Sequence, residues 1–355
     1  PIDVLITHHG PIMNEVIGVP EGAEPLALQW TALEGTQILR SVRLLDLASN
    51  WDEFREAVRY WEAPSQNLVY ADVEGNIGYQ TPGLIPVRAP GHQGLVPVPG
   101  WTGEYEWQGF IPYDELPSVL NPPTGFLVAA NNKVVPDDYP HHLAYEWAAP
   151  YRAQRIVDLL AADESVSIQA SRDIQADTYS LPAEALRPYM LAVEPDPSSG
   201  LQATAQNLLA EWDLYLEADR TGASVYQAWL WSLLENTFGD ELGEDLVAEY
   251  IDSSNMSVPL LVDIMEEAEN GWFDDVTTSD VETRDDILRR SLADAVDWLS
   301  EHHGADPDKW EWGRLHSKTF VHNPLGQSGI GLLEDLFNSN TIQARGDSFT
   351  VDAAW

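Results

Sequence analysis

The chain has 355 residues, of which 58 are aspartate or glutamate and 18 are lysine or arginine, giving a formal net charge of -40. Its 44% hydrophobic residues suit a globular protein, and no apolar run approaches the roughly 18 residues that a membrane-spanning helix needs. The negative charge repels phosphate backbones, which argues against nucleic-acid binding. The absence of cysteine excludes disulfides and thiolate chemistry.

The acidic residues are spread over the whole chain and do not form a tail. Lysine occurs only at Lys133, Lys309 and Lys318. A dispersed acidic surface with few lysines is typical of proteins from high-salt organisms, where screening shortens the range of repulsion between like charges. We therefore expect a halophilic protein, in preference to one whose acidic surface serves a single cationic partner.

The first third of the chain is expected to form strands and turns. Residues 3–8 are strand-like and end at Gly10-Pro11. Asn50, with Glu53 three residues later, predicts the N-cap of a helix. Two β-prone runs within residues 66–79 flank Glu74-Gly75-Asn76, which predicts a hairpin.

Residues 81–124 are rich in Pro, Gly and Trp and have no helical period, which predicts ordered coil. From Pro150, which fits the first position of a helix, helical periodicity predominates to about residue 310. Ser279 and Glu282 are expected to form a capping box. Residues 314–320 and 348–351 are β-like.

General catalytic motifs are absent. The sequence contains no G-x-S-x-G elbow, no P-loop and no dinucleotide fingerprint. The histidine pairs His8-His9, His141-His142 and His302-His303 consist of chain neighbours, whose side chains point to opposite faces of a strand and do not face one another on a helix. Surface or packing roles are therefore favoured for all three, and we expect no metal site.

A series of ordered motifs runs along the chain, dense over residues 65–156 and weaker to either side. The motifs are Ser65-Gln66-Asn67, Tyr70-Ala71-Asp72 with Gly75-Asn76-Ile77-Gly78-Tyr79, the block from His92 to Gly109, Asn121-Pro122-Pro123, Ala130-Asn131-Asn132, Asp138-Tyr139-Pro140, Pro150-Tyr151-Arg152, and the weaker His9-Gly10-Pro11 and Trp312-Gly313-Arg314-Leu315-His316. In this order they resemble the β-subunit of the penicillin acylase family of N-terminal-nucleophile hydrolases.

The resemblance implies an α+β fold, part of an αββα sandwich with a largely helical insertion. The implied segments are a partial core over residues 1–155, a helical unit over 156–312 and a return to the core sheet over 313–355. The resemblance also implies that residues 1–10 and 345–352 pair in one sheet across this long separation.

The resemblance further implies a hydrolase that cleaves an acyl group from a linear or β-lactam-type amide. In this family the nucleophile is a serine that self-cleavage exposes at the start of the β-subunit, with its own α-amine as base. The family's oxyanion donor maps onto Asn131, and its arginine near the nucleophile maps onto Arg152. Gln66 is a weaker candidate for substrate binding. Outside this context, an ordinary turn asparagine is the favoured interpretation of Asn131.

The sequence departs from the family pattern at its start and at one metal ligand. Pro1 has no hydroxyl, so the nucleophile is expected upstream, together with the α-subunit and the β-subunit N-terminal segment, and this chain alone is expected to be inactive. The family's late calcium ligand falls at His141 or His142, and imidazole is a poor ligand for calcium. We therefore expect no cofactor. The resemblance also implies export.

The sequence is compatible with more than one substrate and more than one function. Substrates consistent with the family include penicillins, cephalosporin side chains, acyl-homoserine lactones and cyclic lipopeptides. A Trp-rich coil with many acids also suits a carbohydrate-active or glycan-binding protein. A third possibility is a non-catalytic structural fragment.

Overall fold

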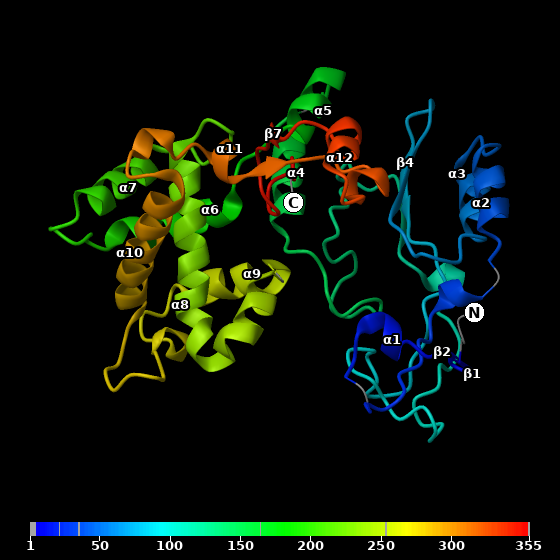
Figure 1. Cartoon of the computed structure of the whole chain (residues 1–355). Helices are drawn as coiled ribbons and strands as arrows, with labels where there is room; N and C mark the ends of the chain where they lie inside the picture. The colour runs from blue at the N-terminus through cyan, green and yellow to red at the C-terminus, as the bar shows by residue number, and fades with distance from the viewer. Residues whose placement is uncertain (1–4, 21, 35, 164, 253, 354–355) are drawn as a thin grey trace. The chain divides into compact units, whose positions relative to one another are not determined.

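The computed structural model describes residues 5–20, 22–34, 36–163, 165–252 and 254–353. The chain divides into two units of different secondary structure, residues 1–147 and residues 148–355 (Figure 1). Asp3 and Val4, at the start of the first predicted strand, and Pro1 lie outside the described residues. The segments expected from the family resemblance, residues 1–155, 156–312 and 313–355, stay predictions.

The first unit consists of short strands, short helices and a long stretch of coil. β1 pairs with β2, and β3, β4 and β5 form an antiparallel sheet in that order. The elements are β1 (Ile6–Thr7), β2 (Gly10–Pro11), α1 (Asn14–Ile17), α2 (Ile38–Leu45), α3 (Trp51–Val58), β3 (Leu68–Ala71), β4 (Ile77–Gln80) and β5 (Ser118–Leu120), with 3-10 turns at Thr31–Leu33 and Tyr113–Glu115.

The predicted hairpin and the predicted helix cap in this unit are both confirmed. Leu68 pairs with Gln80 in the β3–β4 register, and Gly75 in the connecting turn has φ 88°. The side chain of Asn50 accepts a hydrogen bond from the Glu53 amide at 3.0 Å and so caps α3. α3 buries Phe54 and Val58 and lies against the hairpin.

The predicted coil region is held together by backbone hydrogen bonds and a small core. The amide of Val87 donates to Gly109 at 2.9 Å, and the amide of Ile111 donates to Ile85 at 2.9 Å. Ile85, Ile111 and Leu116 form the buried cluster beneath these contacts. The coil is thus packed, although its prolines prevent a regular ladder of hydrogen bonds.

The second unit is largely helical, as the periodicity predicts. A two-stranded sheet pairs β6 with β7. The elements are α4 (Tyr151–Ala161), α5 (Ile168–Gln175), α6 (Leu181–Ala192), α7 (Gly200–Glu211), α8 (Thr221–Asp252), α9 (Ser254–Ile264), α10 (Arg284–His303), α11 (Trp312–Leu315), β6 (Ser317–Lys318), α12 (Gly331–Phe337) and β7 (Ile342–Gln343), with 3-10 turns at Gly271–Phe273, Pro307–Lys309 and Leu325–Gln327.

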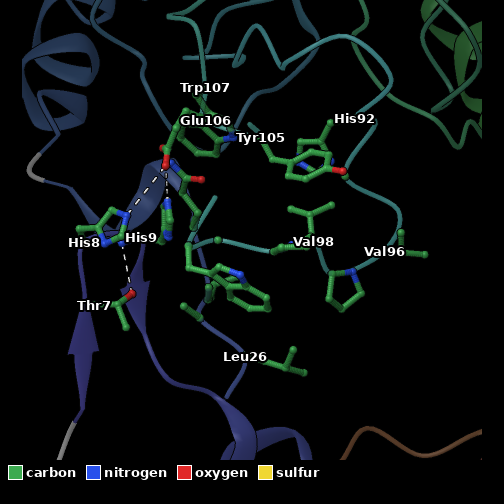
Figure 2. A pocket seen from close by; sticks show the side chains of 18 of the residues that line it. Thr7, His8, His9, Leu26, His92, Val96, Val98, Tyr105, Glu106 and Trp107 are labelled. Atoms are coloured by element: carbon green, nitrogen blue, oxygen red, sulfur yellow. Dashed lines mark hydrogen bonds and ion pairs between the residues drawn. The ribbon is translucent and has the colours of Figure 1, made fainter. Parts of the chain in front are cut away.

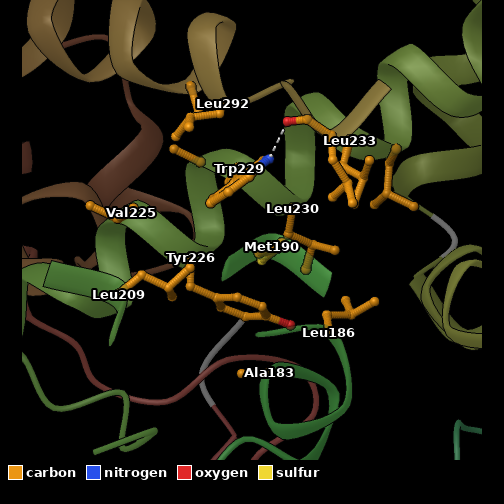
Figure 3. Close-up of a cluster of buried hydrophobic side chains, with 14 of the residues drawn as sticks. Ala183, Leu186, Met190, Leu209, Val225, Tyr226, Trp229, Leu230, Leu233 and Leu292 are labelled. Atoms are coloured by element: carbon orange, nitrogen blue, oxygen red, sulfur yellow. Dashed lines mark hydrogen bonds between the residues drawn. The ribbon is translucent and has the colours of Figure 1, made fainter. Parts of the chain in front are cut away.

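The core of the second unit surrounds the first half of α8. Tyr226, Trp229 and Leu233 are fully buried there, with side chains of α6, α7 and α10 around them (Figure 3). The indole Nε1 of Trp229 donates to the carbonyl of Leu288 in α10 at 3.0 Å, which satisfies its polar atom. The element α8 changes direction at Gly243, whose φ is 75°. No helix among the described residues is long and apolar enough to cross a bilayer.

The predicted start of the last long helix is wrong by four residues. The N-cap of α10 is Thr283, and the carboxylate of Asp286 accepts from its amide at 3.0 Å. Glu282, the expected partner of Ser279, instead contacts Arg290 at 3.4 Å and accepts from the Asp275 amide at 3.3 Å. The Glu282 carboxylate therefore forms an ion pair with Arg290 and does not cap the helix.

The β-like end of the chain is a turn. The Oδ1 atom of Asp347 accepts hydrogen bonds from the amides of Phe349 at 2.8 Å and Thr350 at 3.0 Å, which bends residues 347–350. The expected pairing between residues 1–10 and 345–352 is wrong for the described residues. β1 and β7 are two-residue strands, and each pairs with the strand nearest to it in its own unit.

Candidate functional site

Asn131 lies on an exposed loop of the first unit in a left-handed backbone conformation. Its φ is 61°, and it follows the buried Ala130. Asparagine tolerates this region better than most residues do. The next side chain, Asn132, is used locally: its Oδ1 accepts from the Ala130 amide at 3.1 Å, and its Nδ2 donates to the Lys133 carbonyl at 3.0 Å. Asn132 therefore secures the turn on which Asn131 is presented.

Asn121 offers a contrast, because it has a similar backbone conformation and a structural role. Its φ is 49°. Its Oδ1 accepts from the Ile77 amide at 3.0 Å, and its Nδ2 donates to Asn76 Oδ1 at 2.9 Å. Both amide atoms thus tie the end of β5 to the β3–β4 hairpin.

Arg152 lies in the first turn of α4, in the second unit. Its side chain is half-buried, and burial lowers its pKa. Arg155, one turn further along α4, forms two hydrogen bonds to the carboxylate of Asp177 at 2.9 and 2.7 Å. Asn131 and Arg152 belong to different units, each described by itself, so their convergence on one site stays a prediction.

Gln66 is exposed and lies two residues before the start of β3. Its neighbours hold the strand start in place: Ser65 Oγ donates to the Pro82 carbonyl at 2.8 Å, and Asn67 Oδ1 accepts from the hydroxyl of the buried Tyr79. Gln66 is thus carried on a fixed backbone, and its role in substrate binding stays a prediction.

Asp72 organises the turn of the hairpin through its carboxylate. It accepts from the side chain of Asn76 at 2.8 Å and the amide of Asn76 at 2.9 Å, and from the amide of Glu74 at 3.0 Å and the hydroxyl of Tyr70 at 2.8 Å. Hydrogen bonds from Asn76 lower the pKa of Asp72 to about 2. Burial and the bond to Asp72 raise the pKa of Tyr70 to about 12. This part of the family signature is therefore structural.

The first unit contains a cavity of about 600 Å³ that no sequence pattern predicted (Figure 2). Its wall is formed by the β1–β2 turn, residues 25–29 and the coil of residues 94–107. The lining is aromatic and aliphatic, with Trp101, Trp107 and Leu26 among its members, and His8, His9 and Glu106 supply polar atoms. The density of Trp in the coil was the available signal, but the segments that complete the cavity are about 90 residues apart.

His141 and His142, onto which the resemblance maps the family's late calcium ligand, line a smaller cavity of about 300 Å³. His141 Nε2 lies 2.6 Å from Glu115 Oε2, and His142 lines the same cavity. The imidazole at this position offers a nitrogen, whereas calcium prefers oxygen ligands. The expectation that the family's calcium is not bound here stays a prediction.

Comparisons with known proteins agree on one family. The penicillin amidase family model matches residues 1–355. An acyl-homoserine lactone acylase of Pseudomonas fluorescens is 31% identical over 360 residues, covering 95% of this chain and 43% of that protein. Penicillin acylase 2 proenzyme of a Pseudomonas species is 36% identical over 227 residues, covering 64% of this chain and 29% of that protein.

The fold agrees with a solved structure of the same family. Thermostable penicillin G acylase from Alcaligenes faecalis superposes with a TM-score of 0.70 at 22% identity, covering 97% of this chain and 66% of that chain. The chain spans less than half the length of the curated relatives described above. It has the α+β N-terminal-nucleophile hydrolase fold in part, and with a family match along its whole length it belongs to the penicillin amidase family.

Proposed function

We propose that the whole protein hydrolyses acyl amides through an N-terminal serine that lies outside this chain. The family match along residues 1–355 supports this reaction class, and the relatives include acyl-homoserine lactone and penicillin acylases. The serine hydroxyl attacks the amide carbonyl, and the α-amine of the same residue takes its proton. The protonated α-amine passes this proton to the amide nitrogen as the bond between that nitrogen and the acyl carbon breaks, and the amine leaves. Water then releases the acyl group as a carboxylic acid and restores the serine hydroxyl.

In this proposal Asn131 is the oxyanion donor. The observation that supports this role is the position of Asn131 on a fixed, exposed turn. Its amide is exposed on a turn that Asn132 and the buried Ala130 secure. A donor of this kind must be fixed before the reaction, because it stabilises charge only where charge develops. Arg152 positions Asn131 or the serine amine, and Gln66 contacts the substrate.

The α-subunit and the start of the β-subunit supply the nucleophile and the rest of the site. The second unit carries exposed apolar side chains on which further polypeptide can pack, including Phe320, Leu332 and Leu336. We also propose that the protein is exported, by analogy with the family.

The test replaces Asn131 by glycine in the full-length processed protein. Glycine removes the side-chain amide without backbone strain, because it adopts a φ of 61° freely. We expect kcat on a chromogenic acyl anilide or an acyl-homoserine lactone to fall roughly a hundredfold to a thousandfold. The midpoint of thermal unfolding is measured beside kcat, so that a loss of stability is separated from a loss of catalysis.

Asn121→Gly is the matched control, since it removes a positive-φ asparagine whose amide bonds are structural. It should lower the unfolding midpoint and leave kcat nearly unchanged. The 355-residue chain alone, without the nucleophile, should show no turnover. An unchanged kcat in Asn131→Gly would reduce Asn131 to a turn residue, and turnover by the chain alone would place the nucleophile elsewhere.

A further inference from the structure

Three side chains from two distant segments of the first unit meet at the edge of the larger cavity. His8, His9 and Glu106, here called the His–His–Glu cluster, place one ligand atom each within 4.8 Å of the others. Glu106 Oε1 lies 2.9 Å from His9 Nε2 and 3.9 Å from His8 Nε2 (Figure 2). It is the only such group among the described residues.

The two histidines share a side of the chain because they lie in a turn. They connect β1 to β2, so the alternation that separates neighbours on a strand does not apply to them. Thr7 Oγ1 accepts from the His9 amide at 3.2 Å and donates to the Gly10 carbonyl at 3.0 Å, which fixes the turn. The ring centroids of His8 and His9 lie 3.8 Å apart.

Two glycines permit this arrangement: Gly10, which follows His9 in the chain, and Gly100, which lies against the His9 ring. Gly10 has φ 130°, and a Cβ there would lie 2.0 Å from the Leu28 carbonyl oxygen. A Cβ on Gly100 would lie 3.1 Å from Nδ1 of His9. The Nδ1 edge of the ring is therefore confined against Gly100, while Nε2 faces Glu106.

We infer that the His–His–Glu cluster binds a divalent transition-metal ion of the zinc type. Two ligands of one tetrahedral zinc lie roughly 3.3 Å apart, given metal–ligand distances of about 2.0–2.1 Å. The observed 2.9 and 3.9 Å between Glu106 and the two histidines lie on either side of that separation, and all three donors lie within 4.8 Å of one another. Side-chain adjustments of at most about 1.5 Å therefore bring the donors into place.

The donor set selects the class of metal. Two imidazole nitrogens and one carboxylate suit zinc, nickel and copper, whereas calcium and magnesium prefer oxygen ligands throughout. Three protein ligands leave a fourth position for water or a small anion. The cluster lines the cavity, so that position is accessible from it. The chain's negative charge also raises the local concentration of cations.

The test measures zinc binding by the full-length processed protein after metal removal, by calorimetry and by competition with a chromogenic chelator. We expect wild type to bind one more Zn²⁺ per chain than His8→Ala or Glu106→Gln. Affinity for this ion should fall at least about a hundredfold, since even outer-shell substitutions cost about 10–100-fold. The side chain of His8 is 72% exposed, so its removal leaves the packed core intact.

His141→Ala is the matched control, because it removes a histidine that also contacts a carboxylate but has no third donor nearby among the described residues. It should bind zinc like wild type. Cobalt bound to wild type should show the visible absorption of a tetrahedral site, and excess calcium should not displace it. Equal zinc stoichiometry in wild type and both cluster variants, or the same loss in His141→Ala, would overturn the assignment.

Discussion

At the scale of single residues, the same side-chain type serves different purposes according to its contacts. Asn121 and Asn131 both have positive φ. The amide of Asn121 is bound to the β3–β4 hairpin on both sides, whereas the turn at Asn131 is secured by the neighbouring Asn132. A structural asparagine and a candidate oxyanion donor are therefore distinguished by what fixes the backbone, and the proposed pair of glycine variants measures that difference.

Asp72 predicts a pH dependence of stability. Its folded-state pKa of about 2 lies below its ordinary value of 3.8, so the hydrogen bonds to its carboxylate stabilise the fold fully above that ordinary value. The stabilisation is lost as pH falls through 3.8 toward 2, because the protonated acid no longer accepts all four donors. Asp72→Asn should lower the free energy of unfolding at pH 7, and the difference from wild type should shrink below about pH 4.

Urea unfolding at a series of pH values measures this difference. Glu74→Gln is the control, since it removes one charge from the same turn without touching the four donors to Asp72. Its difference from wild type should change little over the same pH range. A constant difference between wild type and Asp72→Asn down to pH 2 would contradict the assigned shift.

At the scale of elements, the contact between α7 and α8 depends on one glycine. A Cβ at Gly222 would lie 2.5 Å from Trp212 Cβ and 2.7 Å from the Leu208 carbonyl oxygen. Backbone and Cβ atoms cannot turn aside as a flexible side-chain end can. The two elements can therefore pack this closely only when residue 222 has no side chain.

Gly222→Ala should lower the free energy of unfolding by about 1–3 kcal/mol, the usual cost of overpacking. Gly239→Ala in the same element is the control: the nearest atom to its Cβ would be Val247 Cγ2 at 4.0 Å. It should raise stability by about 0.5–1 kcal/mol through the lower helix cost of alanine. Chemical denaturation compares the two, and equal effects would show that the contact at Gly222 relaxes without cost.

At the scale of the whole molecule, charge repulsion opposes the folded state. The formal net charge of -40 is carried by acids dispersed along the chain. Many of the cations, such as Arg59 and Lys309, form ion pairs on the surface, and exposed pairs contribute little stability. We therefore expect added salt to stabilise the folded state, because it screens the repulsion between the acidic side chains.

The free energy of unfolding should rise between about 0.1 and 1 M salt, as the Debye length falls from about 10 to about 3 Å. NaCl and KCl should give the same slope, because screening depends on ionic strength and not on the cation. Thermal unfolding over a salt series measures the effect. A flat or falling curve would contradict the expectation that the protein is adapted to high salt.

Local features of the fold were predictable from the sequence. The cap at Asn50 and the turn at Gly75 depend on residues within a few positions of each other, so their patterns determine them. The prediction at Ser279 was wrong because a tertiary ion pair with Arg290 engages Glu282. The strand predicted at residues 348–351 was wrong because Asp347, half-buried and bound by Gln227 at 2.7 Å, bends the backbone there.

The sequence by itself determined the family, through ordered motifs along the chain, and with it the candidates Asn131, Arg152 and Gln66. It also determined the helical character of the second unit, because periodicity is a local property. Only the tertiary structure decided which side chains meet. Glu106 contacts His9 although the two residues are 97 positions apart in the sequence, and Gly100 confines the His9 ring. Contacts at such separations arise from how the coil folds back on the β1–β2 turn, which no local pattern of residues specifies.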